Sequence, residues 1–184
     1  KGEWRNLLLS DCRRLDTNAF PLMVQRFAAL AYPVSNDPPD QIPEPRLQSD
    51  PASVENALAT FGLGIENRIL AICPGAEFGV AKQWPAEHFA ATCKTKIDNG
   101  WQVWIFGSEK DAEVANEIRQ MLAEEQRQNC VSLAGRTSLA QAIDLLSVAE
   151  AVISNDSGLM HIAAALDKPI VALYGSTSPD FTPP

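Results

Sequence analysis

The stretch ILAICPGAEFGVAKQWPAEHFAATCKTKIDNGWQVWIFG, residues 69–107, contains the pattern that decides the fold. A continuous apolar run at 69–73 predicts a strand that is buried on both faces. A segment with apolar residues at helical spacing follows at 85–100, and a second apolar run lies at 102–107. Strand, helix and strand in this order predict two parallel strands joined by a right-handed crossover.

The same alternation continues along the rest of the chain. Further apolar runs are CVSL (130–133), AVIS (151–154) and PIVALYG (169–175), and the helical segments between and around them are 110–126, 138–149 and 157–166. We therefore expect an α/β fold, a doubly wound parallel sheet of the Rossmann-like kind with helices on both faces.

The residues before this region have a different composition. Helical spacing over 19–32 predicts one amphipathic helix. Residues 33–51 hold six of the thirteen prolines, which predicts an extended linker. A short helix is expected at 51–63, ended by Gly62 and Gly64. The predicted organisation is an inter-domain segment at 1–32, the linker at 33–51, and a Rossmann-like domain at 52–184 that is truncated at its C-terminus.

Charge, cysteine content and hydropathy argue against several classes of function. With 23 acidic and 15 basic residues the net charge is −8, which disfavours binding to nucleic acid or to an anionic membrane. The four cysteines include no CxxC pair and predict reduced, mostly buried thiols in a cytosolic protein. No apolar run approaches the ~18–20 residues of a membrane span. Because the chain begins with Lys1 and stops in a loop, we expect it to be a fragment of a longer protein.

Chemistry is expected at one edge of the sheet, because ligands bind outside the carboxyl ends of parallel strands. The loops there are PGAEFGVAKQW (74–84), SEKD (108–111), AGRT (134–137), NDSG (155–158) and GSTSPDFTPP (175–184). They contain neither a dinucleotide fingerprint nor a Walker loop. His88 and His161 are far apart in sequence and lack a third ligand at metal-like spacing, so no metal site is predicted.

The NDSG loop precedes a helix and allows two interpretations. Capping of that helix, with Asp156 at or near the N-cap, explains Asp156 and Ser157. It does not explain Gly158, which costs roughly 0.5–1 kcal/mol relative to alanine. The amides of Ser157, Gly158 and Leu159, at the positive end of the helix, would instead form an anion site.

Two side chains would complement an anion at that position. Lys82 lies in the long loop before Trp84 and Pro85, and His161 lies about one turn into the helix. Taken alone, either side chain is better explained as an ordinary surface or core residue. Beside an anion site both become candidates, and Asp156 is expected to turn away from phosphate toward ligand hydroxyls.

The SEKD and AGRT loops could contact the rest of a nucleotide. Glu109 or Asp111 could accept both hydroxyls of a ribose, or could simply favour the dipole of the following helix. Gly135, Arg136 and Thr137 could line a base pocket.

Five motifs in order, PGAEFGVAKQWP, FGSEKD, LAGRTSL, NDSGLMHIAAAL and LYGSTSPDFTPP, resemble the ADP-heptose:lipopolysaccharide heptosyltransferases. RLDTNAFPLMVQRFAALAY extends the resemblance over nearly the whole chain, except the linker, whose length departs from the family pattern. PGAEFG and SPDFTPP are nearest to the heptosyltransferase II group. The resemblance implies a GT-B enzyme, with its active site between two Rossmann-like domains. This chain resembles the carboxyl-terminal, donor-binding half, and the acceptor half is missing.

The same resemblance implies roles for individual residues. Lys82 would contact the diphosphate, and Asp156, Ser157 and Gly158 the diphosphate and heptose. His161 would adjoin that site, the SEKD loop would meet the ribose, and Thr137 would lie near the adenine. The full predicted substrate-binding set is Pro74, Gly75, Ala76, Lys82, Gly107, Ser108, Glu109, Asp111, Thr137, Asp156, Ser157, Gly158, Leu159 and His161.

The implied reaction is an inverting, metal-independent transfer of L-glycero-D-manno-heptose from ADP-heptose to a heptose of the lipopolysaccharide inner core, without a cofactor. Lys82 and His161 would act in catalysis by stabilising charge on the leaving diphosphate. The base belongs to the missing acceptor half, so we expect the isolated chain to be inactive. The expected location is the cytoplasm, at the inner face of the inner membrane. The alternatives are a sugar-nucleotide epimerase of similar fold and a non-catalytic nucleotide-binding module.

Overall fold

The computed structural model describes residues 8–35, 37–39, 41–76 and 80–184. The chain divides into two compact units. Unit 1 comprises Lys1–Glu44 and Ser178–Pro183, and unit 2 comprises Pro45–Thr177 with Pro184. The division between Glu44 and Pro45 falls inside the predicted proline-rich linker at 33–51.

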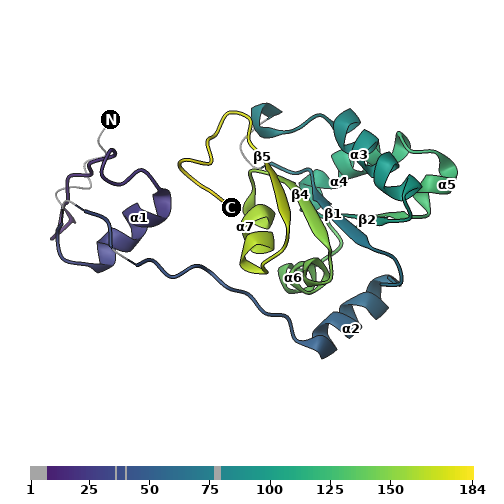
Figure 1. Ribbon diagram of the computed structural model, residues 1–184, viewed down its shortest axis with the longest axis horizontal. Helices are drawn as coiled ribbons and strands as arrows, with labels where there is room; N and C mark the ends of the chain where they lie inside the picture. Colours follow the sequence, from purple (N-terminus) through teal and green to yellow (C-terminus); the bar gives the residue numbers. More distant parts are fainter. Residues whose placement is uncertain (1–7, 36, 40, 77–79) are drawn as a thin grey trace. The chain divides into compact units, whose positions relative to one another are not determined.

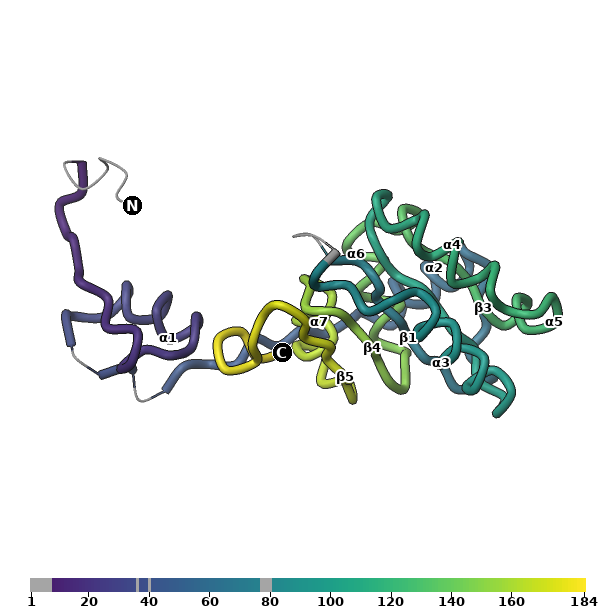
Figure 2. The backbone as a smooth tube through the Cα atoms, turned by 90° about the horizontal axis from the view of Figure 1, so that it is seen from above, coloured from purple at the N-terminus to yellow at the C-terminus, as the bar shows by residue number. Residues whose placement is uncertain are grey.

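Unit 2 is built on a five-stranded parallel sheet. Its strands are β1 (Ile69–Cys73), β2 (Gln102–Ile105), β3 (Cys130–Ser132), β4 (Ala151–Asn155) and β5 (Ile170–Leu173). They are arranged in the order β3-β2-β1-β4-β5, so β4 lies between β1 and β5 (Figures 1 and 2). Every pairing is parallel, which confirms the predicted doubly wound sheet.

Helices cover both faces of this sheet, and every residue of β1 is therefore buried. Leu70 and Ile72 pack toward one set of helices, and Ile69, Ala71 and Cys73 pack toward the other. The first set is α3 (Ala86–Asp98) and α4 (Ala112–Gln120), and the second is α2 (Pro51–Phe61), α6 (Leu139–Ser147) and α7 (Gly158–Ala165) (Figure 1). The alternation of side chains along β1 thus produces two apolar layers, one on each side of the sheet.

The short helix predicted after the linker is confirmed as α2. Asp50 caps its start, because its carboxylate accepts a 3.0 Å hydrogen bond from the Ser53 amide, and Pro51 occupies the first turn. Gly62 ends the helix in a left-handed conformation, with φ of +64°.

The prediction of a single helix at 110–126 is wrong. The structure instead has a 3-10 turn η4 (Glu109–Asp111), then α4, and then the short helix α5 (Glu124–Arg127). Arg127 explains the break, because its guanidinium donates to the carbonyls of Gln120 and Leu122 at 2.8 and 3.0 Å. A side chain thereby binds carbonyl groups left without partners at the end of α4.

In unit 1 the helix predicted at 19–32 is shorter than expected. It consists of α1 (Met23–Ala28) followed by a 3-10 turn η2 (Ala29–Ala31). The Asp16 carboxylate accepts hydrogen bonds from the amides of Asn18 and Ala19, which holds the preceding residues in a turn. The described residues between 33 and 50 form neither helix nor strand.

The cysteines are distributed unequally between the surface and the core. Cys12 is exposed, whereas Cys73, Cys93 and Cys130 are buried. Burial raises the pKa of the Cys73 thiol to about 12. Within the described ranges, none of the helices is long and apolar enough to cross a bilayer.

Candidate functional site

The topology of the sheet places two loops at the carboxyl ends of neighbouring strands. The chain leaves β1 toward α3 on one face of the sheet, and leaves β4 toward α7 on the other face. The neighbouring strands β1 and β4 therefore form a topological switch point, the position at which open α/β sheets bind ligands. Loop 74–84 follows β1, and the NDSG loop follows β4.

Lys82, Asp156 and Thr177 meet at this switch point, and we name them the switch-point cluster. Lys82 ends the 3-10 turn η3 (Val80–Lys82), and its Nζ lies 2.8 Å from Asp156 Oδ2. Thr177 Oγ1 donates to the same carboxylate oxygen at 2.7 Å. The Lys82 and Asp156 side chains are only 17% and 9% exposed, so the charges are largely shielded from solvent.

The cluster keeps Asp156 ionised. Burial on its own would raise the pKa of this carboxyl. The hydrogen bonds from Lys82 and Thr177, with the positive charges of Lys82 and His161, outweigh burial and hold the pKa below its usual value. Lys82 and Asp156 were predicted to contact different parts of a ligand, whereas in the structure they bind each other.

The start of α7 directly follows Asp156 of this cluster in the chain. Gly158 is its first residue and Ser157 is the N-cap, but no side chain caps the helix, so the capping role predicted for Asp156 is not observed. In the part of the chain that the structure describes, no hydrogen bond is made by the amides of Ser157, Gly158 and Leu159. A Cβ atom built on Gly158 meets nothing within 4 Å. The helix start thus combines unpaired donors with room for an anion.

Glycines allow the surrounding loops to pack closely. A Cβ atom on Gly175 would overlap the carbonyl oxygen of Ala81, beside Lys82. Gly75 and Gly107 both pack against the Asp111 side chain, where an added Cβ would lie 2.5 or 2.6 Å from its atoms. The structure thereby brings together Gly75, Gly107 and Asp111 from the loops after β1 and β2.

The two carboxylates of the SEKD loop have different surroundings. Asp111 Oδ2 accepts hydrogen bonds from the amide and the hydroxyl of Ser108, both at 2.7 Å. Asp111 therefore stabilises its own turn. Glu109 is exposed, and among the described residues its side chain makes no hydrogen bond.

The AGRT loop packs against this turn, and among the described residues its side chains make no hydrogen bond to the switch-point cluster. Gly135 has φ of +71°, and a Cβ there would lie 2.9 Å from the Glu109 Cα. Arg136 turns back, donating to the Ser132 carbonyl and stacking over the Phe61 ring. Thr137 is half-buried, and no hydrogen bond joins it to another predicted site residue among those described.

The remaining predicted residues lie close to the cluster or continue its loops. Pro74 is buried, Ala76 is half-buried, and the adjoining residues 77–79 lie outside the described residues. Leu159 packs its side chain into the core, which leaves only its amide for a ligand. His161 is exposed on α7.

Two residues of the site were missed by sequence reasoning. Thr177 gave no signal, because a threonine in a loop is unremarkable. Asn155 is fully buried at the end of β4, where it bonds to Pro74 and Trp84. A polar amide directly after an apolar strand was the available signal, since a buried amide needs hydrogen-bond partners.

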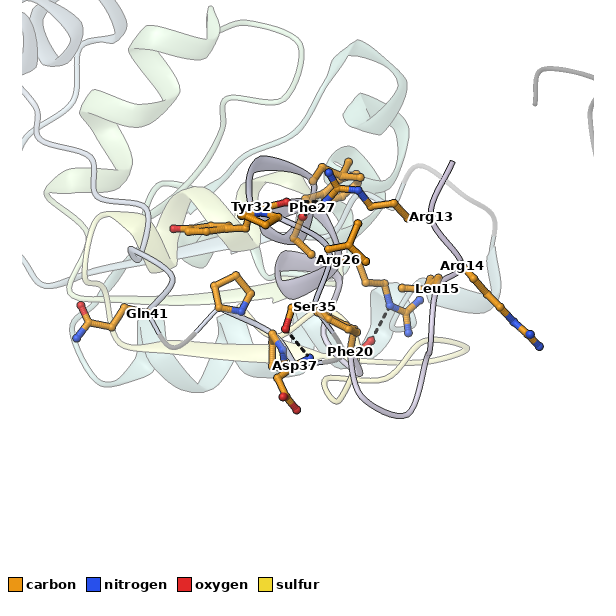
Figure 3. Close-up of a pocket in the computed structure, with 16 residues that line it drawn as sticks. Arg13, Arg14, Leu15, Phe20, Arg26, Phe27, Tyr32, Ser35, Asp37 and Gln41 are labelled. Atoms are coloured by element: carbon orange, nitrogen blue, oxygen red, sulfur yellow. Dashed lines mark hydrogen bonds between the residues drawn. The ribbon is translucent and has the colours of Figure 1, made fainter. Parts of the chain in front are cut away.

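A cavity of about 980 Å³ lies elsewhere, within unit 1 (Figure 3). Arg13 and Arg26 line it, but both are engaged by main-chain carbonyls: Arg13 donates to Ala29 and Tyr32, and Arg26 to Phe20. These arginines stabilise the fold of unit 1, and the cavity contains none of the predicted site residues. In the described ranges no group of three metal-ligating side chains occurs.

Comparisons with known proteins agree with the motifs. A family model described as glycosyltransferase family 9 (heptosyltransferase) matches residues 1–184. The chain is 49% identical to lipopolysaccharide heptosyltransferase 2 of Salmonella typhimurium, and 49% identical to that of Escherichia coli, with all of this chain and 54% of each relative covered. The chain thus spans about half the length of the curated relatives it matches.

Solved structures give the same result. The structure of E. coli ADP-heptose lps heptosyltransferase II matches with a TM-score of 0.90 and 48% identity, over 98% of this chain and 56% of that one. E. coli heptosyltransferase WaaC with ADP-2-deoxy-2-fluoro heptose matches with a TM-score of 0.54 and 28% identity, over 74% of this chain and 41% of that one.

Proposed function

Because the family model covers the whole chain, the chain belongs to glycosyltransferase family 9, the heptosyltransferases, and from that membership we propose that unit 2 binds an ADP-sugar donor. The observation that carries this proposal is the switch-point cluster beside the open start of α7. A lysine, an ionised aspartate and three amides that make no hydrogen bond to a described residue lie where α/β sheets bind nucleotides.

The diphosphate is assigned to the amides of Ser157, Gly158 and Leu159 and to Lys82. An ammonium carries three N–H donors, so pairing with Asp156 is compatible with a phosphate contact. His161 adds a donor one turn into α7. Pro74, Gly75 and Ala76 begin the loop that contains Lys82, and Gly175 contacts the same loop at Ala81. Asp156 orients Lys82 and offers its carboxylate to the sugar hydroxyls.

The ribose is assigned to Glu109 rather than to Asp111. The Asp111 carboxylate already accepts two hydrogen bonds from Ser108. Glu109 is exposed in the same turn, and Gly107 and Ser108 support that turn. Thr137 is kept as the candidate for contact with the adenine, because its loop packs against Glu109 through Gly135.

In the intact protein we assign an inverting transfer of heptose from ADP-heptose to a heptose of the lipopolysaccharide inner core. As the glycosidic bond breaks, negative charge develops on the departing ADP. Lys82, His161 and the helix amides stabilise that charge. By analogy with oxyanion sites, each donor contributes roughly 3 kcal/mol. This electrostatic role needs no metal ion, and the acceptor and the base are assigned to the part of the protein outside this chain. The proposed location is the cytoplasm, at the inner face of the inner membrane.

Calorimetric titration of this chain with ADP, then with ADP-heptose, in the presence and absence of EDTA, tests the proposal. We expect ADP binding that EDTA does not weaken, and no heptose transfer by the isolated chain. UDP is the control. Preference for UDP would favour a sugar-nucleotide epimerase. Absence of nucleotide binding would refute the proposal, whereas ADP binding combined with an inactive intact protein would indicate a non-catalytic module.

A further inference from the structure

Asn155 is a fully buried amide at the carboxyl end of β4, at the switch point of the sheet. Strand β4 pairs directly with β1, which ends at Cys73 opposite Ser154. Within the described ranges Ser154 and Asn155 are the buried polar residues of the core. Leaving a buried donor or acceptor without a hydrogen-bond partner is costly, and the great majority of buried polar groups have one.

Both ends of the Asn155 amide are used, and they bind the two ends of one loop. Its Nδ2 donates to the carbonyl of Pro74 at 2.7 Å, where loop 74–84 begins. Its Oδ1 accepts from the amide of Trp84 at 3.1 Å, where the loop ends. One side chain therefore fixes the distance between the first and last residues of the loop.

The end of the loop at Trp84 is anchored a second time. The Trp84 ring packs against His88 and Phe89 of α3, with centroids 5.2 and 5.0 Å apart. Lys82 lies two residues before this anchor and pairs with Asp156, which directly follows Asn155 in the chain. The lysine and its aspartate partner are thus both attached to the position of Asn155.

We propose that Asn155 is a positioning residue, which clamps loop 74–84 across the switch point so that Lys82 reaches Asp156 and the donor diphosphate. Its effect on catalysis rests on the proposed function, whereas its effect on the loop does not. Asn155 is buried and acts through Lys82.

The first experiment measures hydrogen exchange in the intact protein and compares three variants. Asn155→Asp keeps the size of the side chain but loses the donor toward Pro74, and Asn155→Ala removes both hydrogen bonds without adding charge. Val152→Ala is the matched control, because it removes buried atoms from the same strand and touches neither bond. We expect exchange in peptides covering loop 74–84 to rise about tenfold in both Asn155 variants and to be unchanged in the control.

The second experiment asks whether Asn155 acts through Lys82, using a double-mutant cycle on kcat/KM. Asn155→Ala alone is expected to lower kcat/KM by roughly ten- to a hundredfold, the cost of a displaced catalytic group. In a Lys82→Ala background the same substitution should cost about twofold or less, because the positioned group is already absent. A merely structural role would lower both backgrounds by the same factor.

A pH profile adds a rescue that is specific to the clamp. On acidification the carboxyl introduced by Asn155→Asp becomes protonated, and its O–H regains a donor toward Pro74. The defect of Asn155→Asp in kcat/KM should therefore shrink relative to the wild type as the pH falls, and the defect of Asn155→Ala should not.

Unchanged exchange in loop 74–84, or an equal rise in Val152→Ala, would overturn the clamp, and so would additive effects in the double-mutant cycle. Loss of nucleotide binding in the wild type would contradict the proposed function alone. The exchange result would then still decide whether Asn155 holds the loop.

Discussion

At the residue scale, Lys82 and Asp156 form a pair whose charges are mostly shielded from water. Removing either partner leaves the other charge with little solvation, which is more costly than removing a residue from a surface pair. In the intact protein, Lys82→Ala and Asp156→Ala should each lower kcat/KM at least about tenfold, because one interaction with the departing diphosphate is lost. Steady-state kinetics measures the change in kcat/KM, with Lys94→Ala, at an exposed position, as the control. Near-wild-type turnover in both variants would refute the assignment.

The same pair predicts a dependence of stability on pH. Against the effect of burial, Lys82 and Thr177 hold the pKa of folded Asp156 below the value of 3.8 for an unperturbed aspartate. The resulting stabilisation is complete above that value and is lost as the pH falls through the lower folded pKa. Urea unfolding of wild type and Asp156→Asn should show a gap in the free energy of unfolding that is constant at neutral pH and closes only in acid. A gap that widens on acidification would contradict this sign.

Two glycines separate stability from binding. Gly158 has open space where a Cβ would stand, so Gly158→Ala should change the free energy of unfolding by no more than about 1 kcal/mol, with any gain coming from helix propensity. It should nevertheless weaken ADP binding about tenfold, because the methyl group fills the approach to the α7 amides.

Gly175→Ala is the contrasting variant. Its Cβ overlaps the Ala81 carbonyl, so we expect destabilisation by about 1–3 kcal/mol. Thermal unfolding and calorimetry distinguish the two, and equal behaviour of both variants would be evidence against this geometry.

At the element scale, the turn η4 assigns different roles to two neighbouring carboxylates. Asp111→Ala should destabilise the chain by about 1 kcal/mol, since it removes the acceptor for both Ser108 donors. Glu109→Ala should leave the free energy of unfolding within about 0.5 kcal/mol, because the side chain is exposed. It should lower affinity for ADP but not for inorganic diphosphate, which has no ribose. If only Asp111→Ala lowers the ADP affinity, the ribose assignment must be exchanged.

Element prediction succeeded where residue pattern and packing agree. The five strands were predictable because each is a short apolar run between turn residues, and α2 was predictable from Pro51 and Gly62. The break after α4 was not, because it depends on Arg127 reaching back to carbonyls of the preceding turn, and no glycine or proline marks it. Long side chains that bind main-chain carbonyls leave no periodic signal in a sequence.

At the scale of the whole molecule, the position of the site was predictable and its internal contacts were not. Parallel strands force the five loops to one edge, so their composition was enough to locate the candidate site. The pairing of Lys82 with Asp156 joins residues 74 positions apart in sequence, and the Asn155 clamp joins residues 71 and 81 apart. Such pairings follow from the register between β1 and β4, which the order of apolar runs does not specify.

The burial of three cysteines has a practical consequence for spectroscopy. The thiolate is the form that reacts with maleimides, and Cys73 is both inaccessible and held protonated by its high pKa. Cys93 and Cys130 are enclosed in the core, while Cys12 is exposed on unit 1. A fluorophore or spin label can therefore be attached to the native chain at Cys12 without replacing any other cysteine. A second label introduced on unit 2 would then report the distance between the two units as nucleotide is added.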